Sequence, residues 1–166
     1  MTLTIISGGQ TGVDRGALDA ALATGTPCGG WCPEGRMADD GVIPAIYPVK
    51  ELIGAGYRKR TRQNVLDSDA TVIIYFDYIF PRGGTEQTLL ECIKADKPYL
   101  LIDGQELSTA RAAQKTRDFV RKHQIQRLNI AGPKAYVITD AQVGIDAHTY
   151  TQDMLTLLIQ QHKTDE

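Results

Sequence analysis

Residues 2–24, TLTIISGGQTGVDRGALDAALAT, pass from a strand through a glycine loop into a helix. Residues 2–6 are β-branched and apolar, which is typical of a short buried strand. From residue 11 to residue 24 the apolar residues recur at helical spacing, and Gly25 supplies the stop because glycine adopts the left-handed cap without a Cβ penalty. The stretch therefore predicts a strand–loop–helix unit of an α/β protein.

The same alternation continues along the chain. Residues 70–76, 98–102 and 128–132 are apolar runs of the kind found in strands covered on both faces, and 28–31 fit a further short strand. Residues 32–48 hold three prolines and two glycines and are interpreted as an ordered loop. Helices are expected at 57–67, at 109–123, at 147–162 and after Gly83, the last with Leu89, Leu90, Cys92 and Ile93 on its inner face.

Strands that alternate with helices imply right-handed crossovers and a mainly parallel sheet. We expect one domain over residues 1–166, with a Rossmann-like, doubly wound sheet of five or six strands and helices on both faces. If the strand order is of the Rossmann kind, the first and fourth strands are neighbours at the switch point. The two glycine loops would then lie side by side at the carboxyl ends of adjacent strands.

Composition limits the classes of partner. The chain has 18 basic and 20 acidic residues, a net charge of −2, so no overall attraction for nucleic acid or an anionic membrane is expected. No apolar run approaches the roughly 20 residues of a membrane span. No signal peptide is evident, and the three cysteines are an odd number, which indicates a reducing cytoplasm.

The first glycine loop has the features of an anion site. Glycines let backbone N–H groups approach a ligand closely, and the start of the following helix adds unpaired donors and the positive end of its dipole. Arg15, one turn into the helix, is placed to pair with a phosphate. The candidate ligand groups are Ser7, Gly8, Gly9, Gln10, Thr11 and Gly12. The alternative is a tight turn in which Thr11 only caps the helix.

The second loop, Arg82-Gly83-Gly84-Thr85, repeats this arrangement after the strongest strand. Two such loops at positions expected to converge are better evidence for a phosphate site than one. Between them, Trp31 suggests a flat platform and Arg36 a charged clamp, although Trp31 would equally close the edge of the domain and Arg36 would equally be solvated. The basic run 58–62 is interpreted as a solvated helix face or as the rim of a crevice.

Catalytic and metal patterns are weak. Cys28 and Cys32 are spaced C-x3-C, a poor match to zinc ligands, and no histidine lies nearby. We find no Ser–His–Asp order and no paired carboxylates typical of a catalytic set. A carrier or binding protein is therefore favoured over an enzyme.

Five blocks of the sequence carry a resemblance to a known family. The blocks are SGGQTGVDRGALDAAL, GGWCPEGRMADDG, YRKRTRQNVLDSDATVII, RGGTEQT and RLNIAGP. They resemble the molybdenum cofactor carrier proteins, a family within the Rossmann-like superfamily of the lysine-decarboxylase-like phosphoribohydrolases and DNA-processing protein A. They run in the family's order from about Thr4 to Pro133, and the GGWCP and LNIAGP blocks are the specific ones.

The resemblance implies a homo-oligomer, a dimer or tetramer, that binds and stores or transfers molybdenum cofactor (molybdopterin), with molybdoenzymes as recipients. That cofactor is a pterin with a terminal phosphate and a dithiolene-bound oxo-metal. Helix N-termini suit its phosphate and oxo-anion, and Trp31 suits its pterin ring. The expected contacts are residues 7–12 with Arg15, Trp31 and Arg36, together with Gly83, Gly84, Thr85 and Thr88.

One departure from the superfamily bears on catalysis. The phosphoribohydrolases carry a glutamate three residues after the threonine of the second loop, and here that position is Thr88. The binding half of the site is therefore expected to remain without the acid. The alternatives left open are a phosphoribohydrolase or N-glycosidase that uses Glu86, Glu91 or Asp14, and a nucleotide-sensing module.

Overall fold

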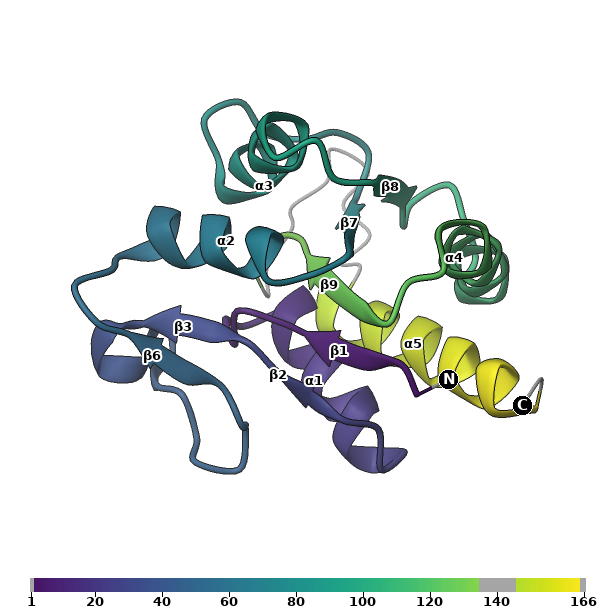
Figure 1. Ribbon diagram of the computed structural model, residues 1–166, viewed down its shortest axis with the longest axis horizontal. Coiled ribbons are helices and arrows are strands. Elements are labelled where there is room, and N and C mark those ends of the chain that lie inside the picture. Colours follow the sequence, from purple (N-terminus) through teal and green to yellow (C-terminus); the bar gives the residue numbers. More distant parts are fainter. Residues whose placement is uncertain (1, 135–145, 165–166) are drawn as a thin grey trace.

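The computed structural model describes residues 2–134 and 146–164, and its centre is a five-stranded parallel sheet. The strands lie in the order β2-β1-β9-β7-β8 (Figure 1). Their bounds are β1 Thr4–Ile6, β2 Cys28–Gly29, β7 Ala70–Tyr75, β8 Tyr99–Asp103 and β9 Arg127–Ala131. The α/β class and the parallel Rossmann-like sheet expected from the sequence are confirmed.

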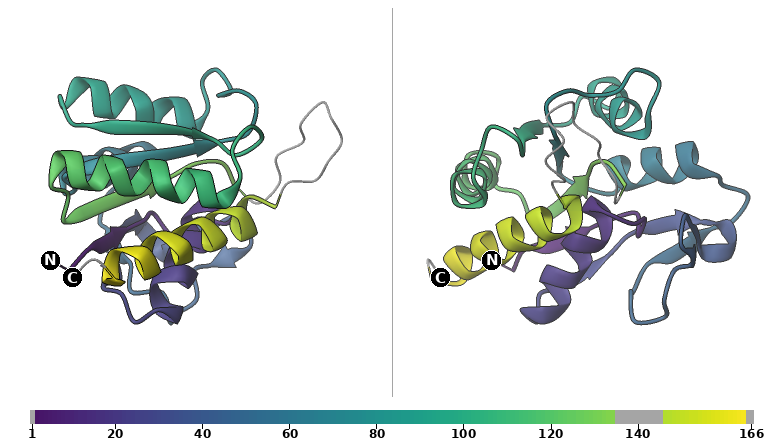
Figure 2. Two further views of the ribbon diagram at one scale, coloured as in Figure 1. Left: turned by 90° about the vertical axis from the view of Figure 1, so that its right-hand side faces the viewer. Right: turned by 180° about the vertical axis from the view of Figure 1, so that it is seen from behind.

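Five helices cover the two faces of this sheet (Figures 1 and 2). Side chains of α1, α4 and α5 pack with the strands in the main core on one face, and α2 and α3 lie together on the other. The helices are α1 Val13–Ala23, α2 Tyr57–Leu66, α3 Gly84–Lys94, α4 Thr109–His123 and α5 Ala147–Thr164. Each lies within a few residues of its predicted position.

The strand order differs from the one expected. β9 lies between β1 and β7 and pairs with both, so the two glycine loops do not follow adjacent strands. Leu128 and Ile130 of β9 are fully buried, as befits the central strand. An apolar run identifies a buried strand but does not state its neighbours, which is why the sequence did not reveal this order.

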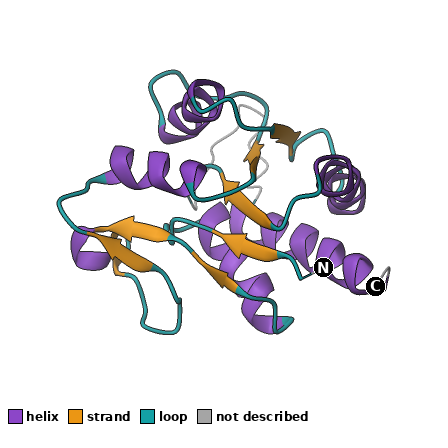
Figure 3. Cartoon of the chain, viewed as in Figure 1, coloured by secondary structure: helices purple, strands orange, loops and turns teal. Residues whose placement is uncertain are grey.

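Residues 31–52 are more ordered than a loop (Figure 3). They contain a parallel pair, β3 Trp31–Pro33 with β6 Lys50–Leu52, and a small hairpin, β4 Met37–Ala38 with β5 Gly41–Val42. A single 3-10 turn, η1 Glu34–Arg36, joins β3 to β4. These strands are too short to show a periodicity of their own, and the buried Cys32, Ile43, Tyr47 and Val49 with Leu18 of α1 form a second small core beneath them.

Helix α3 buries only part of the face predicted for it. Thr88 and Cys92 are its buried residues, whereas Leu90 and Ile93 are exposed. The physical reason is position: α3 covers the end of the sheet, where β8 is an edge strand, so one side of the helix has no neighbour among the described residues.

Candidate functional site

A pocket of about 400 Å³ lies where β1, β9 and β7 end and α2 and α3 begin. Gln10 and Asp14 line it from the first loop and α1, and Gly83 to Thr85 line it from the second loop. The last residue of β9 and the three that follow it, Ala131 to Lys134, line the pocket between these two walls, because β9 lies between β1 and β7 in the sheet. Carboxyl ends of parallel strands are the usual ligand side of such folds.

The N-terminus of α3 is open to this pocket. Gly83 is the N-cap, and the backbone N–H groups of Gly84, Thr85 and Glu86 have no acceptor among the described residues. A Cβ added at Gly84 would meet nothing within 4 Å. Free N–H groups and the positive end of the helix dipole make this a ready anion site.

The first loop, by contrast, satisfies part of its own donors. Gly9 N–H donates to Ser7 Oγ (3.3 Å), Gln10 N–H donates to Asp14 Oδ2 (3.2 Å), and Val13 N–H donates to the carbonyl of Pro133 (3.2 Å). An internal carboxylate thus already occupies the helix start. Of the residues predicted here, the pocket lining includes Gln10 but not Ser7, Gly8, Gly9, Thr11 or Gly12.

Asp14 carries the acidic group of the pocket. It is buried, and Nη1 of Arg60 lies 3.6 Å from its Oδ2. Burial raises the pKa of Asp14 above its ordinary value, and the positive charge of Arg60 offsets part of that rise. A Cβ at Gly8 would come within 1.9 Å of Nη1 of Arg60, so the glycine leaves room for this guanidinium.

The aromatic ring of Tyr57 lies close to two cations. The guanidinium of Arg60 lies 5.9 Å from the centre of its ring, and Nζ of Lys134 lies 5.3 Å from it, within cation–π range. Lys134 also pairs with Asp39 (2.8 Å). Tyr57 belongs both to this pocket and to an adjoining one of about 500 Å³ that Arg58, Arg82 and further residues line.

Three predicted site residues lie elsewhere. Arg15 donates to the carbonyl of Gly9 and pairs with Asp40 through both terminal nitrogens, so its guanidinium holds the β4–β5 hairpin rather than facing the pocket. Arg36 donates to the carbonyls of Ile43, Pro44, Tyr47 and Val49 and thereby fixes the loop over the small core. Neither lines the pocket.

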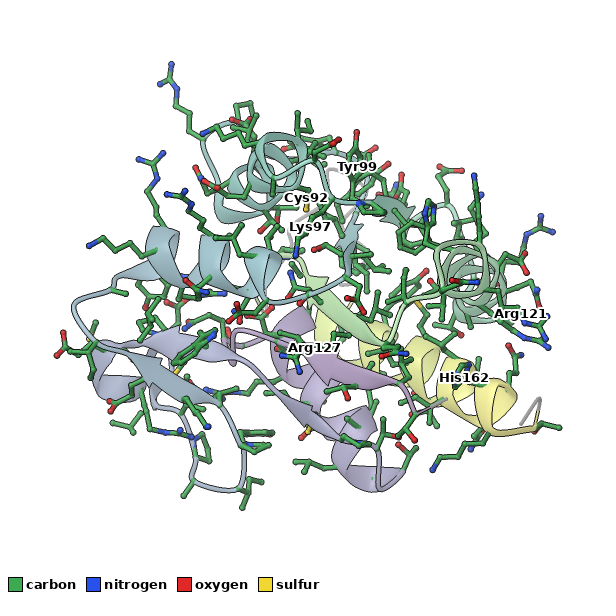
Figure 4. The ribbon with its side chains drawn as sticks, in the orientation of Figure 1. Cys92, Lys97, Tyr99, Arg121, Arg127 and His162 are labelled. Atoms are coloured by element: carbon green, nitrogen blue, oxygen red, sulfur yellow. The ribbon has the colours of Figure 1, made fainter. Side chains whose placement is uncertain are left out.

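Trp31 is the third. Its indole N–H donates to Asp67 Oδ2 (2.6 Å), and its ring lines a separate hollow of about 270 Å³ on the α2 side of β1 and β2. Lys50 and Arg127 line the same hollow, and Figure 4 shows Arg127 beside β1. Because this hollow shares no residue with the pocket, the structure places Trp31 outside the pocket that the second glycine loop and Gln10 line.

The residues considered as catalytic acids do not lie together in the pocket. Thr88, where the superfamily has glutamate, lines the pocket but donates its hydroxyl to the carbonyl of Gly84 (3.0 Å). Glu86 lines the adjoining pocket, and Glu91 accepts from Gln87 and lies near Arg62. Asp14 is thus the carboxylate in the pocket lining.

Several lining residues were not singled out from the sequence as ligand contacts. Arg60 lies in the basic run that was interpreted as either a solvated face or a crevice rim, and the structure places it in the pocket. The others are Tyr57, Thr61, Phe80 and residues 131–134. The available signal was position: each follows a strand or begins a helix at the ligand side of the sheet.

Over residues 2–134 and 146–164, no group of three or more His, Cys, Asp or Glu side chains is arranged to hold a metal ion. No helix in that part of the chain is long and apolar enough to cross a membrane.

Comparison with known proteins gives the pocket a context. Residues 5–155 match the model of the circularly permutated YpsA SLOG family. A solved crystal structure from Syntrophus aciditrophicus SB, described as a "Putative molybdenum carrier protein", is 41% identical to the chain and superposes with a TM-score of 0.83. That match covers 95% of this chain and 94% of the other. No curated protein matches the chain significantly.

Proposed function

The chain belongs to the circularly permutated YpsA SLOG family, and we propose that it binds molybdenum cofactor in the pocket between α1, α2 and α3 and stores or carries it. The observation that carries this proposal is the open N-terminus of α3 facing a pocket with two cationic side chains, Arg60 and Lys134. The solved relative at 41% identity, named for molybdenum carriage, supports the choice of cargo.

The phosphate of the cofactor is assigned to α3. Gly84, Thr85 and Glu86 offer backbone donors there, and the first loop is less suitable because the carboxylate of Asp14 already lies at the start of α1. Gly83 and Thr88 then shape the floor of the phosphate site rather than donate to it.

The pterin ring is assigned to Tyr57 and Phe80. Both line the pocket, and Tyr57 has its face against two cations. They take the role that the sequence suggested for Trp31. The molybdenum is held by the dithiolene of the cofactor itself, so the chain need not supply metal ligands. A pocket of about 400 Å³ joined to one of about 500 Å³ is in the range of sites for molecules of this size.

A holding site fits the chemistry of the lining better than an active centre. The position of the superfamily acid is Thr88, whose hydroxyl is bonded within α3. Asp14 contacts Arg60 and caps a loop donor, so its Oδ2 is committed to structure. Release of the cargo to molybdoenzymes in the cytoplasm is the role proposed for the complex.

The test uses cofactor freshly released from a molybdoenzyme. We expect the purified protein to retain molybdenum and pterin in equimolar amounts through gel filtration, measured by elemental analysis and by fluorescence of the oxidised pterin. Retention of neither would overturn the proposal. Release of free base from a nucleoside monophosphate by the protein, abolished in Asp14→Asn, would favour the hydrolase instead.

The proposed homo-oligomer has a candidate face at α3 and β8. β8 is an edge strand with one charge, at its last residue, and edge strands of this kind are normally protected or paired. Tyr99 and Leu101 of β8 and Leu90 and Ile93 of α3 are exposed there, and Figure 4 shows Tyr99 at the rim beside β8. A second copy offers the same apolar edge and can pair with it about a two-fold axis.

Ile93→Glu is expected to shift the protein to a smaller species in size-exclusion chromatography with light scattering. A charge in an apolar interface is costly, while the folded monomer should keep its melting temperature because Ile93 is already 54% exposed. Ile53→Glu, at a side chain that is 75% exposed on another part of the surface, is the matched control. Equal masses for the parent and Ile93→Glu would contradict this interface.

A further inference from the structure

The inner end of the pocket holds an acceptor that the protein does not use. Asp14 is 5% exposed and lines the pocket. Both of its contacts, the N–H of Gln10 and the guanidinium of Arg60, are made to Oδ2. Oδ1 accepts no hydrogen bond from the residues that the structure describes, and it is not one of their enclosed unpaired atoms, so it reaches the open space of the pocket. A carboxylate on a largely buried residue is stabilised by each donor that it receives, so this oxygen favours a ligand with an N–H group.

Gln10 leaves a second acceptor unpaired. Its side chain is 3% exposed and lines the same pocket, and its Nε2 donates to the carbonyl of Met37 (2.8 Å). That bond fixes the orientation of the amide, and Oε1 is then buried without a partner. Buried polar atoms are almost always hydrogen-bonded, and an exception beside a pocket indicates a missing partner.

A donor lies next to these two acceptors. The guanidinium of Arg60 is mostly buried, it contacts Asp14, and its Nε is also without a partner. Across the pocket, the N–H groups of α3 suit an anion. The pocket is therefore complementary to a ligand that has an anionic group at one end. At its other end, this ligand would have an edge with adjacent N–H donors and a carbonyl oxygen.

We propose that Asp14, Gln10 and Arg60 read the 2-amino-4-oxopyrimidine edge of a bound heterocycle, the edge that a pterin and a guanine share. The carboxylate of Asp14 accepts from the ring N–H and the amino group, Oε1 of Gln10 accepts from the amino group, and Arg60 donates to the oxo group. The inference rests on the proposed function only in using the same pocket, and it concerns which rings that pocket selects.

Three nucleotides with the same phosphate and sugar test this edge. GMP presents the complete edge, IMP lacks the amino group, and AMP turns a ring acceptor toward the carboxylate. By isothermal titration calorimetry of the intact protein we expect GMP to bind about tenfold more tightly than IMP and about a hundredfold more tightly than AMP, since each lost bond joins a donor to a charged group. Equal affinities for the three nucleotides, or no binding of GMP together with no binding of a pterin, would overturn the proposal.

Asp14→Asn removes the charge while keeping the shape. Its amide oxygen can still accept from Gln10, so we expect AMP to bind as before and the preference for GMP over AMP to fall to a few-fold. Asp19→Asn is the matched control on the same helix, because Asp19 contacts Tyr47 and His148 outside the pocket and its loss should leave the preference intact. A preference that survives in Asp14→Asn would contradict the assignment of Asp14.

The same variant reports on folding. Because burial raises the pKa of Asp14, its ionised form opposes folding near neutral pH. Asp14→Asn should therefore melt no lower than the parent at pH 7. Any gain should disappear as the pH falls through the raised pKa toward the ordinary one, where the parent carboxyl is protonated in both states.

A fluorescent probe, 6-carboxypterin, separates the two sources of the edge. Tighter binding of this pterin than of GMP assigns the site to pterins, and the reverse order assigns it to guanine nucleotides; both support the reading of the edge. If GMP or 6-carboxypterin is selected through Asp14 but molybdenum cofactor is not retained, the carrier function fails and the inference stands. If the cofactor is retained equally by Asp14→Asn, the inference fails alone.

Discussion

Gly84→Asp is expected to weaken binding of GMP and of molybdenum cofactor by at least about a hundredfold. The new carboxylate would lie at the first residue of α3, where the phosphate is assigned. Two like charges at about 4 Å repel by roughly 4 kcal/mol in a partly solvated site, more than the roughly 2.7 kcal/mol that a hundredfold change requires.

The stability of the folded Gly84→Asp protein should not fall with its affinity for the ligand. An aspartate in the first turn interacts favourably with the helix dipole, by about 0.3 to 1 kcal/mol. The melting temperature of Gly84→Asp should therefore be equal to or above that of the parent. Loss of binding together with preserved or greater stability distinguishes an occupied anion site from a damaged fold.

Two control variants separate charge from size at this position. Gly84→Ala should bind normally, because a Cβ at Gly84 meets nothing within 4 Å and its φ is not positive. Gly84→Asn has the shape of aspartate without its charge, and it should lose much less affinity. Wild-type affinity in Gly84→Asp, or an equal loss in Gly84→Asn, would contradict the phosphate site at α3.

The local elements of this fold were largely predictable. Helix α4 occupies the predicted residues 109–123, because its pattern is strongly amphipathic and Ser108 caps its start. β7 and β9 were recognisable as buried strands from their apolar runs. These features depend on neighbours in the sequence, and that is the information a single chain displays.

The order of strands and the contacts of the first loop depend on distant residues. Nothing in residues 127–131 states that they pair with both β1 and β7. The first loop has the composition of an anion site, but Asp14, four residues beyond Gln10, supplies the anion from within the chain. A glycine-rich helix start is less suited to an external phosphate when a carboxylate of the protein already accepts from one of its donors.

The arginine side chains also depend on distant residues for their contacts. Arg15 and Arg36 were reasonable phosphate ligands by residue type, but Asp40 and four carbonyls of the loop engage them. Arg60, from a run that was interpreted as either solvated or a rim, reaches the pocket. A guanidinium binds the acceptor that the fold brings nearest, and the sequence does not show which one that is.

Gly30→Ala is expected to cost about 4 kcal/mol or more of folding free energy, the largest effect on stability that we predict. Gly30 has φ +135, a region that residues with a Cβ rarely adopt, and its added Cβ would lie 2.0 Å from the carbonyl oxygen of Ser7. Backbone strain of this kind costs about 1 to 3 kcal/mol before any clash is counted. The obstacle is backbone, so it cannot be relieved by turning a side chain.

Gly29→Ala is the matched control, one residue earlier in the same glycine pair. Its Cβ would meet Pro48 O at 3.4 Å and its φ is not positive, so its cost should stay within about 1 kcal/mol. In thermal unfolding, about 4 kcal/mol corresponds to a fall of roughly 8 to 16 °C for a chain of this size. Equal melting temperatures for the two variants would mean that Gly30 and Ser7 do not approach as closely as the structure shows.

The contrast between these variants also bears on the pocket. The carbonyl of Ser7 would have to move to admit the methyl group, and the hydroxyl of the same residue donates to the carbonyl of Asp14 (2.8 Å). A shift of Ser7 would therefore disturb the first loop and the start of α1, where Gln10 and Asp14 line the pocket. Any Gly30→Ala protein that stays folded should consequently lose its preference for GMP over AMP, while Gly29→Ala should keep it. The second glycine of the GGW block would then act on the ligand through the backbone of Ser7, the residue after β1, without contacting the ligand.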